Sequence, residues 1–373
     1  MIWQSVIGQE RVKAQLLVLL KTGRLAHAYL FQGDDGVGKD AMAIQLAAAI
    51  HCRKGDFDPC GKCPSCLKLA GLQHPDVHLV FSLPVGKDEG KGDHPLEKLS
   101  GPEVDAIREQ IRLKGVNPYH RISVPRATVI KVNSIRDIRR ESVMSTMGSN
   151  RRVVIISRAD EMNEQSSNAL LKTLEEPATE TLFILTSMFP ERLLPTIRSR
   201  CHSVQFDPLG PAEIAGRLVS DGLANETDAR LVAHLAMGSF RRASELLGED
   251  MAEERQQALE FVRLMMGNSF SPLMKRIDEL SAQKDRELVV RFLNLIALWF
   301  RDTLVHSKGG EILNVDQSES IKRFVDRFPA VNYPDILGRL DGAVSLVRRN
   351  GYIPLVLVRL SIELKRSILL TTA

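Results

Sequence analysis

One short glycine-rich segment, GDDGVGKD, constrains this chain more than any other feature. It has the frame of the phosphate-binding loop G-x-x-x-x-G-K-[ST], in which the terminal hydroxyl holds Mg²⁺. Gly33, Gly36 and Gly38 would let consecutive backbone N–H groups turn toward one anion. Lys39 would reach the terminal phosphates of a nucleotide. The last position is Asp40 instead of serine or threonine, so the segment predicts a P-loop fold with an altered nucleotide site.

The second motif that an ATPase needs is altered as well. The apolar run Val153–Ile156 predicts a strand, and such a strand should end in acidic residues that hold Mg²⁺ and orient water. Here it is followed by Ser157 and Arg158. The acidic pair Asp160-Glu161 lies three residues beyond the expected strand end, so it does not replace the missing carboxylates. The pattern predicts an ATPase fold without its catalytic groups, and hence a structural or regulatory role inside an assembly.

The sequence leaves open whether the altered loop binds ATP and Mg²⁺. Asp34, Asp35 and Asp40 all lie in it. A carboxylate about 4 Å from a phosphate charge is repelled by about 4 kcal/mol at an effective dielectric of about 20. That repulsion weakens binding by roughly three decades. Asp40 could instead ligate Mg²⁺ directly, or the segment could be a glycine-rich strand-to-helix turn without a ligand.

Four of the five cysteines fall in one stretch with the spacing C-x7-C-x2-C-x2-C, namely Cys52, Cys60, Cys63 and Cys66. Thiolates two residues apart can turn back on one metal, and a small loop-rich module gains stability from such an ion. Tetrahedral Zn²⁺ with four sulfur ligands fits this set and leaves no open position for catalysis. An iron–sulfur cluster, free thiols and disulfides are the alternatives. We expect one structural zinc ion in a module at about residues 51–75.

Composition sets ordinary bounds on the rest of the chain. Its 373 residues are 44% hydrophobic and 26% charged, which is enough for a large core and favours two or three domains. The formal charge of +4, from 50 basic and 46 acidic side chains, is too mild to indicate nucleic acid by itself. No apolar run reaches membrane-spanning length, and the first residues do not begin a signal peptide. We expect a soluble cytoplasmic protein.

Apolar runs alternate with helix-like runs as far as Pro208. Strands are predicted at residues 27–31, 77–81, 153–156 and 182–186, and helices at 40–50, from Ser134 onward, and at 167–175 up to Pro177. This alternation argues for a parallel sheet covered on both faces.

The pattern after Pro208 is helical only. Apolar residues recur at helical spacing at Leu288, Phe292, Leu295 and Trp299, and again at Leu355, Val358, Ile362 and Leu364. We interpret both stripes as the core of a helix bundle.

Several motifs in the first 250 residues resemble those of bacterial clamp-loader subunits, which are P-loop proteins of the AAA+ class. They are Val6-Ile7-Gly8-Gln9, the run Ala26–Phe31, the run Asn168–Pro177 and the triplet Ser199-Arg200-Cys201, together with the cysteine module directly after the P-loop helix. Within this family, Asp40, Ser157 and Arg158 fit members that keep the fold and the Ser-Arg-Cys motif without a working ATPase site. Residues 83–128 match no family motif, and the sequence assigns them no role.

The resemblance implies a part in DNA replication. Clamp-loader subunits form a five-membered ring through C-terminal helical collars, and the ring loads a sliding clamp onto primed DNA. The implied partners are the gamma/tau and delta subunits in a hetero-pentamer, the clamp and DNA through that complex, and no membrane. By itself the chain would not be an enzyme. It would be a subunit of the DNA polymerase III complex, a nucleotidyltransferase.

The resemblance also implies roles for two arginines. ATP lies between neighbouring subunits of the ring, and Arg200 of the Ser-Arg-Cys motif would project into the site of the adjacent subunit. A guanidinium there stabilises transition-state charge on the γ-phosphate. Arg241, within Gly238–Ala243, resembles the sensor-2 arginine that normally contacts a subunit's own nucleotide.

Two other functions remain open on the sequence. One is an active AAA+ ATPase of the gamma/tau type, with Asp40 as an unusual Mg²⁺ ligand. The other is a zinc-bearing nucleic-acid-binding protein whose arginines contact phosphates, although a solvated helical face is the simpler account of them. These arginines are Arg136, Arg139, Arg140, Arg151 and Arg152.

We predict three parts. Residues 1–208 form the AAA+ P-loop α/β domain with its zinc module. Residues 209–250 form a small helical lid. Residues 251–373 form a helical collar for oligomerisation.

Overall fold

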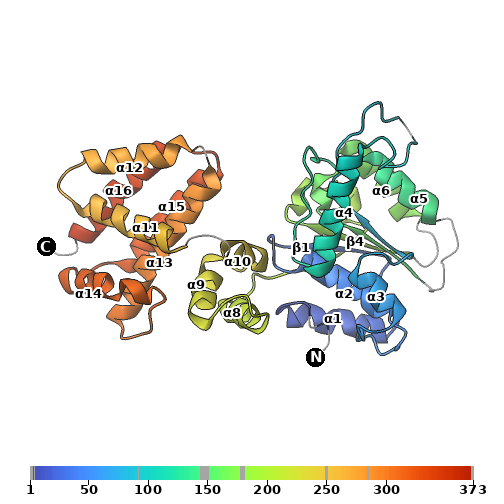
Figure 1. The fold of residues 1–373 in the computed structure, drawn as a ribbon, viewed down its shortest axis with the longest axis horizontal. Helices are drawn as coiled ribbons and strands as arrows, with labels where there is room; N and C mark the ends of the chain where they lie inside the picture. The colour runs from blue at the N-terminus through green and yellow to red at the C-terminus, as the bar shows by residue number, and fades with distance from the viewer. Residues whose placement is uncertain are drawn as a thin grey trace. The chain divides into compact units, whose positions relative to one another are not determined.

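The computed structural model describes Trp3 and residues 5–90, 92–142, 151–176, 181–247, 251–283 and 285–370. By its internal packing the chain divides into two compact units. Unit 1 comprises Met1–Ile214 and Gly238–Arg242, and unit 2 comprises Ala215–Met237 and Ala243–Ala373. Unit 1 contains strands and helices, whereas the described part of unit 2 is helical (Figure 1).

Five short strands form one parallel sheet within the described residues of unit 1. They are β1 (Ala28–Gln32), β2 (Val77–Val80), β3 (Arg152–Ile156), β4 (Thr181–Ser187) and β5 (His202–Gln205). Their order across the sheet is β2-β3-β4-β1-β5, and every neighbouring pair is parallel. β3 and β4 are buried along their whole length, which explains their continuous apolar runs. The parallel sheet predicted from the sequence is therefore confirmed.

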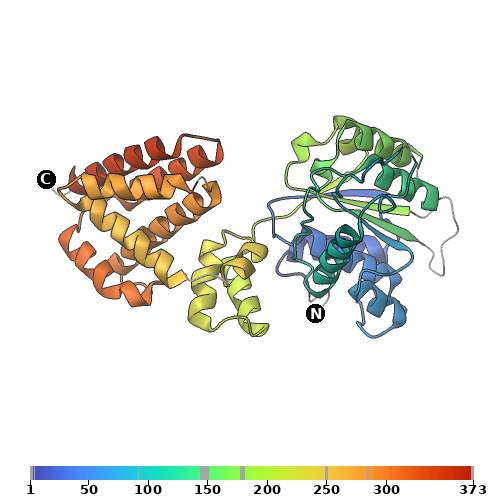
Figure 2. The ribbon, with the colours of Figure 1, turned by 45° about the horizontal axis from the view of Figure 1, so that its top comes forward.

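Helices cover both faces of this sheet, as predicted. Those of unit 1 are α1 (Glu10–Lys21), α2 (Lys39–His51), α3 (Pro64–Ala70), α4 (Gly101–Val116), α5 (Val132–Ser142), α6 (Glu164–Glu175) and α7 (Pro195–Arg198), with 3-10 turns at Ala159–Glu161 and Pro190–Arg192. The blue helices α1 to α3 lie on one side of the sheet and the green helices α5 and α6 on the other (Figure 2). Ile135 of α5 and Leu170 of α6 share a buried cluster with Phe183 of β4.

Local details differ from the sequence-based predictions in three places. Strand β5 was not predicted, because His202–Gln205 is short and only Val204 in it is buried. The helix expected from Ser134 begins at Val132, and Ser134 is buried inside it. Helix α6 begins at Glu164 instead of residue 167. Pro177, which we expected to close α6, lies outside the described residues.

The described residues of 83–128, to which the sequence assigned no role, form a packed part of unit 1. They contain helix α4, and its Ile107 joins Phe81, Leu83 and Val124 in a small buried cluster. A capping box at Ser100 fixes the start of the helix. Lys114 in the last turn of α4 is only 2% exposed. This buried lysine brings the segment into contact with the P-loop.

Unit 2 and its junctions with unit 1 are built from helices over their described residues. They are α8 (Pro211–Ser220), α9 (Glu226–Leu235), α10 (Phe240–Leu246), α11 (Met251–Met266), α12 (Ser271–Ala282), α13 (Arg286–Ser307), α14 (Ser318–Arg327), α15 (Tyr333–Arg348) and α16 (Ile353–Leu370), with a 3-10 turn at Val315–Gln317. The stripe predicted on α13 is core, since Phe292, Leu295 and Trp299 are buried. Among the described residues, no helix combines the length and the apolar character that a membrane span requires.

The stripe predicted on α16 is core only in part. Leu355 and Ile362 are 64% and 54% exposed. Leu364 of the stripe is buried, and the other buried residues of this helix include Val356, Leu357 and Leu360. Because α16 is apolar on more than one face, helical periodicity alone could not identify the face that packs against the other helices.

The arginines considered for nucleic-acid contact do not form one solvated helical face. Arg139 and Arg140 are exposed on α5. Arg152, however, is buried on β3, and Arg151 donates to the carbonyl oxygen of Ala26 at 3.3 Å. For Arg151 and Arg152 the helical interpretation is therefore wrong, and burial of Arg152 removes it from a phosphate-binding surface.

Packing separates two units, and it does not test the predicted division of the helical part at residue 250. Residues 248–250 at that boundary lie outside the described residues. The division into P-loop domain, lid and collar remains a prediction.

Candidate functional site

The P-loop lies between the end of β1 and the start of α2. Gly33 follows directly after the last residue of β1. Gly36 and Gly38 have φ angles of 76° and 102°, which residues with a Cβ rarely adopt. A Cβ at Gly36 would also lie 2.1 Å from the Oγ of Ser239. The turn that the sequence predicted is present, and two of its glycines are required by backbone conformation or by close packing.

Lys39, the first residue of α2, is buried and turned back onto the loop. Its Nζ donates to the carbonyl oxygens of Gly33 at 2.7 Å and Asp34 at 2.5 Å. Burial lowers the pKa of this ammonium, and the nearby carboxylates of Asp40 and Asp35 oppose that shift. The lysine that would reach a nucleotide's phosphates is thus held by the carbonyl groups of its own loop.

Asp40 lies where the motif expects a hydroxyl, and side chains from three other segments hydrogen-bond to its carboxylate. Its Oδ2 accepts hydrogen bonds from Lys114 Nζ at 2.6 Å and Ser157 Oγ at 2.8 Å. Its Oδ1 accepts one from Thr186 Oγ1 at 2.7 Å. Lys114 comes from α4, Ser157 follows β3, and Thr186 is in β4. Lys114 also donates to the carbonyl oxygen of His120 at 2.8 Å.

This network keeps Asp40 ionised. Burial opposes the charged form, but the Lys114 ammonium and the hydrogen bonds from Lys114, Thr186 and Ser157 outweigh it. Together they lower the pKa of the Asp40 carboxyl from 3.8 to about 2. The side chains of Lys114 and Asp40 are 3% and 20% exposed, so solvent screens this ion pair weakly.

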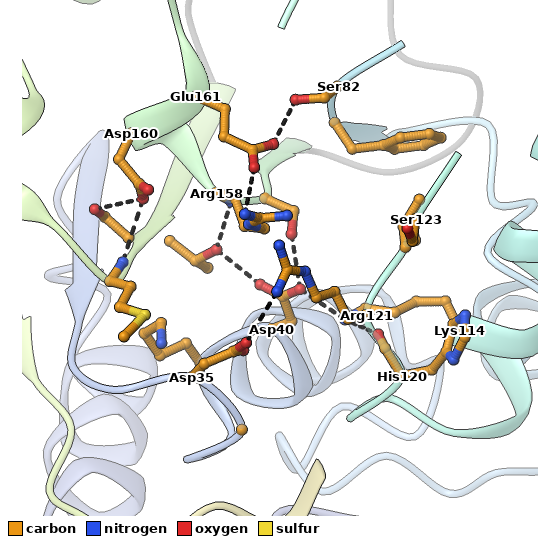
Figure 3. A pocket seen from close by; sticks show the side chains of 18 of the residues that line it. Asp35, Asp40, Ser82, Lys114, His120, Arg121, Ser123, Arg158, Asp160 and Glu161 are labelled. Carbon is orange, nitrogen blue, oxygen red and sulfur yellow. Dashed lines mark hydrogen bonds and ion pairs between the residues drawn. The ribbon is translucent and has the colours of Figure 1, made fainter. Parts of the chain in front are cut away.

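A cavity of about 490 Å³ adjoins the P-loop, and several of its charged side chains form ion pairs (Figure 3). Arg121 lies 3.7 Å from the carboxylate of Asp35. Arg241 approaches the same carboxylate at 3.1 Å, so the structure places this sequence-predicted residue at the loop. Arg158 pairs with Glu161. The carboxylate of Asp35 therefore faces two guanidinium groups and balances the charge of one of them.

Sequence reasoning missed Lys114, Arg121 and Thr186 in this site. Lys114 is 74 positions from Asp40 in the chain, and one lysine in an amphipathic helix gives no local signal of an ion pair. Arg121 lies in the segment that matched no family motif. Thr186 could have been found, because polar residues at the carboxyl ends of neighbouring parallel strands meet at one edge of a sheet.

The four cysteines converge at one point after α2. Their sulfur atoms all lie within 4.8 Å of one another, and the sulfurs of Cys60 and Cys66 are 3.9 Å apart. Sulfurs about 2.3 Å from a tetrahedral Zn²⁺ are separated by about 3.8 Å. The backbone N–H groups of Cys60 and Cys63 point at the sulfurs of Cys52 and Cys60, at 3.4 and 3.3 Å. Such donors stabilise thiolates, and none of the four cysteines is in a disulfide in the described structure. The donor set fits zinc.

We expect elemental analysis of the purified chain to find one Zn²⁺ per molecule. Cys63→Ser should lower zinc affinity and the thermal stability of unit 1, while unit 2 keeps its helical signal in circular dichroism, because metal binding is coupled to folding of the module only. Cys201→Ser is the matched control and should retain zinc, since Cys201 is remote in sequence and buried beside β5. A metal-free protein, or a brown one with visible charge-transfer bands, contradicts the zinc assignment.

Arg200 lies at the amino ends of the strands, whereas the P-loop follows the carboxyl end of β1. Arg200 precedes β5, which runs parallel to β1 with His202 opposite Tyr29 and Gln205 opposite Gln32. The P-loop begins beyond the carboxyl ends of these strands, whereas Arg200 precedes their amino ends. The four residues of β5 that lie between span about 13 Å. Arg200 is accordingly not among the residues that line the cavity.

The Arg200 side chain is partly exposed and held by two contacts. Its Nη2 is 2.9 Å from Oε1 of Glu175, and its Nη1 donates to the carbonyl oxygen of Thr196 at 3.1 Å. The neighbouring Cys201 is buried, which raises the pKa of its thiol to about 12 and keeps it neutral. The Ser-Arg-Cys motif thus places the charged Arg200 at the surface, next to the buried Cys201.

A family model and two curated relatives indicate the delta-type subunits of DNA polymerase III. The family model described as DNA polymerase III, delta subunit, matches residues 8–210. DNA polymerase III subunit delta' of Bacillus subtilis is 28% identical over 320 residues, which is 84% of this chain and 83% of the relative. The subunit delta' of Pseudomonas aeruginosa is 32% identical over 244 residues, or 65% of this chain and 62% of the relative. A crystal structure of a DNA polymerase III gamma subunit-related protein from Thermotoga maritima covers 95% of this chain and 99% of its own at 15% identity and a TM-score of 0.35.

Proposed function

We propose, from the premise that this chain belongs to the DNA polymerase III delta-subunit family, that it is a delta-prime-type subunit of a clamp loader. In this role it does not hydrolyse ATP itself, and it contributes Arg200 to the ATP site of a neighbouring subunit. The two delta' relatives support the subunit type. The geometry of the altered nucleotide site supports the division of labour.

The observation that carries this proposal is the ion pair between Asp40 and Lys114. In a working P-loop a hydroxyl at this position ligates Mg²⁺, and a carboxylate elsewhere in the site orients the attacking water. Here Asp40 accepts from a buried ammonium 2.6 Å away, and Ser157 follows β3. A divalent cation about 4 Å from an ammonium is repelled by about 8 kcal/mol at an effective dielectric of about 20. These residues therefore do not fit a Mg²⁺ site.

The charges around the loop support the same conclusion. In a nucleotide site the cationic side chains normally pair with the phosphates, but here Arg121 and Arg241 both face the carboxylate of Asp35. Lys39 donates to loop carbonyls. A nucleotide would have to displace these contacts before its phosphates reached the cationic groups, so tight binding in this chain is disfavoured.

The position of Arg200 supports a role in trans. Arg200 is partly exposed at the amino ends of the strands, and the cavity beside the P-loop of the same chain lies at their carboxyl ends. That P-loop site has altered catalytic positions at Asp40 and Ser157. An arginine finger that acts in trans has to be exposed and remote from its own nucleotide site, because its guanidinium contacts the γ-phosphate bound by another subunit.

The proposed partners are gamma/tau and delta subunits in a hetero-pentamer, with the sliding clamp and primed DNA engaged through the complex. Support for a helical collar comes from α16, where Leu355, Ile362 and Leu369 recur every seven residues and are 64%, 54% and 44% exposed. An exposed apolar stripe of this kind is typical of helix–helix association. Zinc holds the cysteine module together and has no part in the chemistry.

We expect the isolated chain to show no ATP turnover above background in a steady-state assay with Mg²⁺, and Lys39→Ala to leave that result unchanged. When the chain is added to gamma/tau and delta subunits, it should be required for clamp loading. Substantial turnover that disappears in Lys39→Ala would select the gamma/tau-like ATPase with Asp40 as a Mg²⁺ ligand instead.

A further inference from the structure

We propose that Glu175 is a positioning residue that holds the Arg200 guanidinium ready for the nucleotide of a neighbouring subunit. This inference rests on the trans role proposed for Arg200. It adds a second residue, from a different helix, on which that role depends.

The contact leaves most of the guanidinium available. Glu175 is the last residue of α6, and its Oε1 accepts from Arg200 Nη2 at 2.9 Å. The carbonyl oxygen of Thr196 accepts from Nη1 at 3.1 Å. A guanidinium has five N–H donors in a fixed planar fork, so three remain for phosphate oxygens while these two contacts persist. Arg200 can be anchored and still act on another subunit.

Helix α6 gains nothing from a glutamate at this place. The C-terminus of a helix carries partial negative charge, so the carboxylate of Glu175 is electrostatically unfavourable there. The Glu175 and Arg200 side chains are 44% and 35% exposed, and an exposed ion pair contributes little to folding. If the ion pair stabilised the fold, Glu175→Ala would lower stability slightly. The unfavourable position of the carboxylate at the helix C-terminus predicts instead that Glu175→Ala leaves stability unchanged or raises it.

The expected benefit is orientation. An unrestrained arginine loses considerable rotamer freedom when its fork is fixed on a phosphate. A side chain that is already held in one arrangement loses less, so a larger share of encounters is productive. Removing the carboxylate should therefore slow the chemical step without changing how tightly the neighbouring subunit binds ATP.

The test uses the reconstituted complex with the corresponding finger arginines of the other subunits replaced by alanine, so that turnover is dominated by the interface served by Arg200. Glu175→Ala should lower turnover about three- to fivefold and leave the ATP concentration at half-saturation unchanged. Glu175→Gln should keep most of the activity, because an amide oxygen still accepts from Nη2. Glu176→Ala is the matched control on the adjacent exposed residue and should match the unsubstituted chain.

A double-mutant cycle separates this inference from the function on which it rests. Glu175→Ala combined with Arg200→Ala should be no slower than Arg200→Ala alone, because the carboxylate acts only through the arginine. Unchanged turnover in Glu175→Ala, or a further loss in the Arg200→Ala background, overturns the positioning role. Unchanged turnover in Arg200→Ala itself overturns the trans role and leaves no guanidinium for Glu175 to position.

Discussion

Replacing Arg200 with alanine is expected to slow ATP hydrolysis at one interface of the reconstituted clamp loader by about 10³–10⁵-fold. The guanidinium stabilises charge on the γ-phosphate in the transition state, and alanine supplies neither a charge nor a donor. Folding and assembly should be almost unaffected. Arg200 is partly exposed, and its guanidinium makes polar contacts with Glu175 and the Thr196 carbonyl among the described residues; an exposed pair of this kind contributes about 0–1 kcal/mol.

The measurement has to isolate that interface, because other subunits keep their own arginines and dilute the loss in bulk turnover. Clamp loading onto primed DNA, and ATPase activity in the complex with the other fingers removed, are suitable readouts. Arg198→Ala is the matched control, since Arg198 is an exposed arginine at the end of α7 only two positions away. Arg200→Lys should rescue poorly, because an ammonium lacks the planar fork. Loading at the wild-type rate by Arg200→Ala would leave the chain a purely architectural part.

The fold was accessible from the sequence where burial was complete. β3 and β4 are buried on both faces, so they appear as continuous apolar runs, and the glycines of the P-loop mark the turn from β1 into α2. β5 was not predicted because three of its four residues are exposed. The stripe on α16 was assigned only partly correctly for the opposite reason, since Leu364 is buried whereas Leu355 and Ile362 are apolar without being buried.

The sequence predicted the local motifs of the site but could not predict the contacts between residues that are distant in the chain. The cysteine spacing and the P-loop frame are short-range patterns whose geometry follows from the backbone, and both recur as predicted in the structure. The partner of Asp40 could not be deduced, because Lys114 reaches it only through the packing of α4 against the loop. From the sequence, Asp40 could equally have faced a metal ion. Only the tertiary arrangement identifies the cation that it does face.

Breaking the Asp40–Lys114 pair is expected to destabilise unit 1 by about 3–5 kcal/mol, because either substitution leaves its partner as an uncompensated buried charge. For a unit of this size that corresponds to a fall in melting temperature of about 10 °C. Asp40→Ala and Lys114→Met should each show it, and the double variant should recover much of the loss. The matched control is Glu109→Ala, which breaks an exposed pair with Arg112 on the same helix and should cost at most about 1 kcal/mol.

The pH dependence of the same variants provides an independent check. The pKa of Asp40 is lowered on folding from 3.8 to about 2, so its contribution is fully present above pH 3.8 and is lost as the pH falls through 2. That shift corresponds to about 2 kcal/mol. The stability difference between the wild-type chain and Asp40→Asn should therefore shrink by about that amount between pH 5 and pH 2. A difference that stays constant over this range would show that the pair does not hold the carboxylate in its charged form.

Restoring the P-loop residue alone should not restore an ATPase. Asp40→Ser supplies the hydroxyl that the motif lacks, but it leaves the Lys114 ammonium buried at the place where Mg²⁺ would bind, and Ser157 still offers no carboxylate. We expect this variant to be destabilised like Asp40→Ala and to hydrolyse no ATP. Adding Lys114→Met should recover stability, and turnover should remain absent because no carboxylate directly follows β3 to orient water. If Asp40→Ser alone hydrolysed ATP, the buried ammonium would not be what keeps this site inactive.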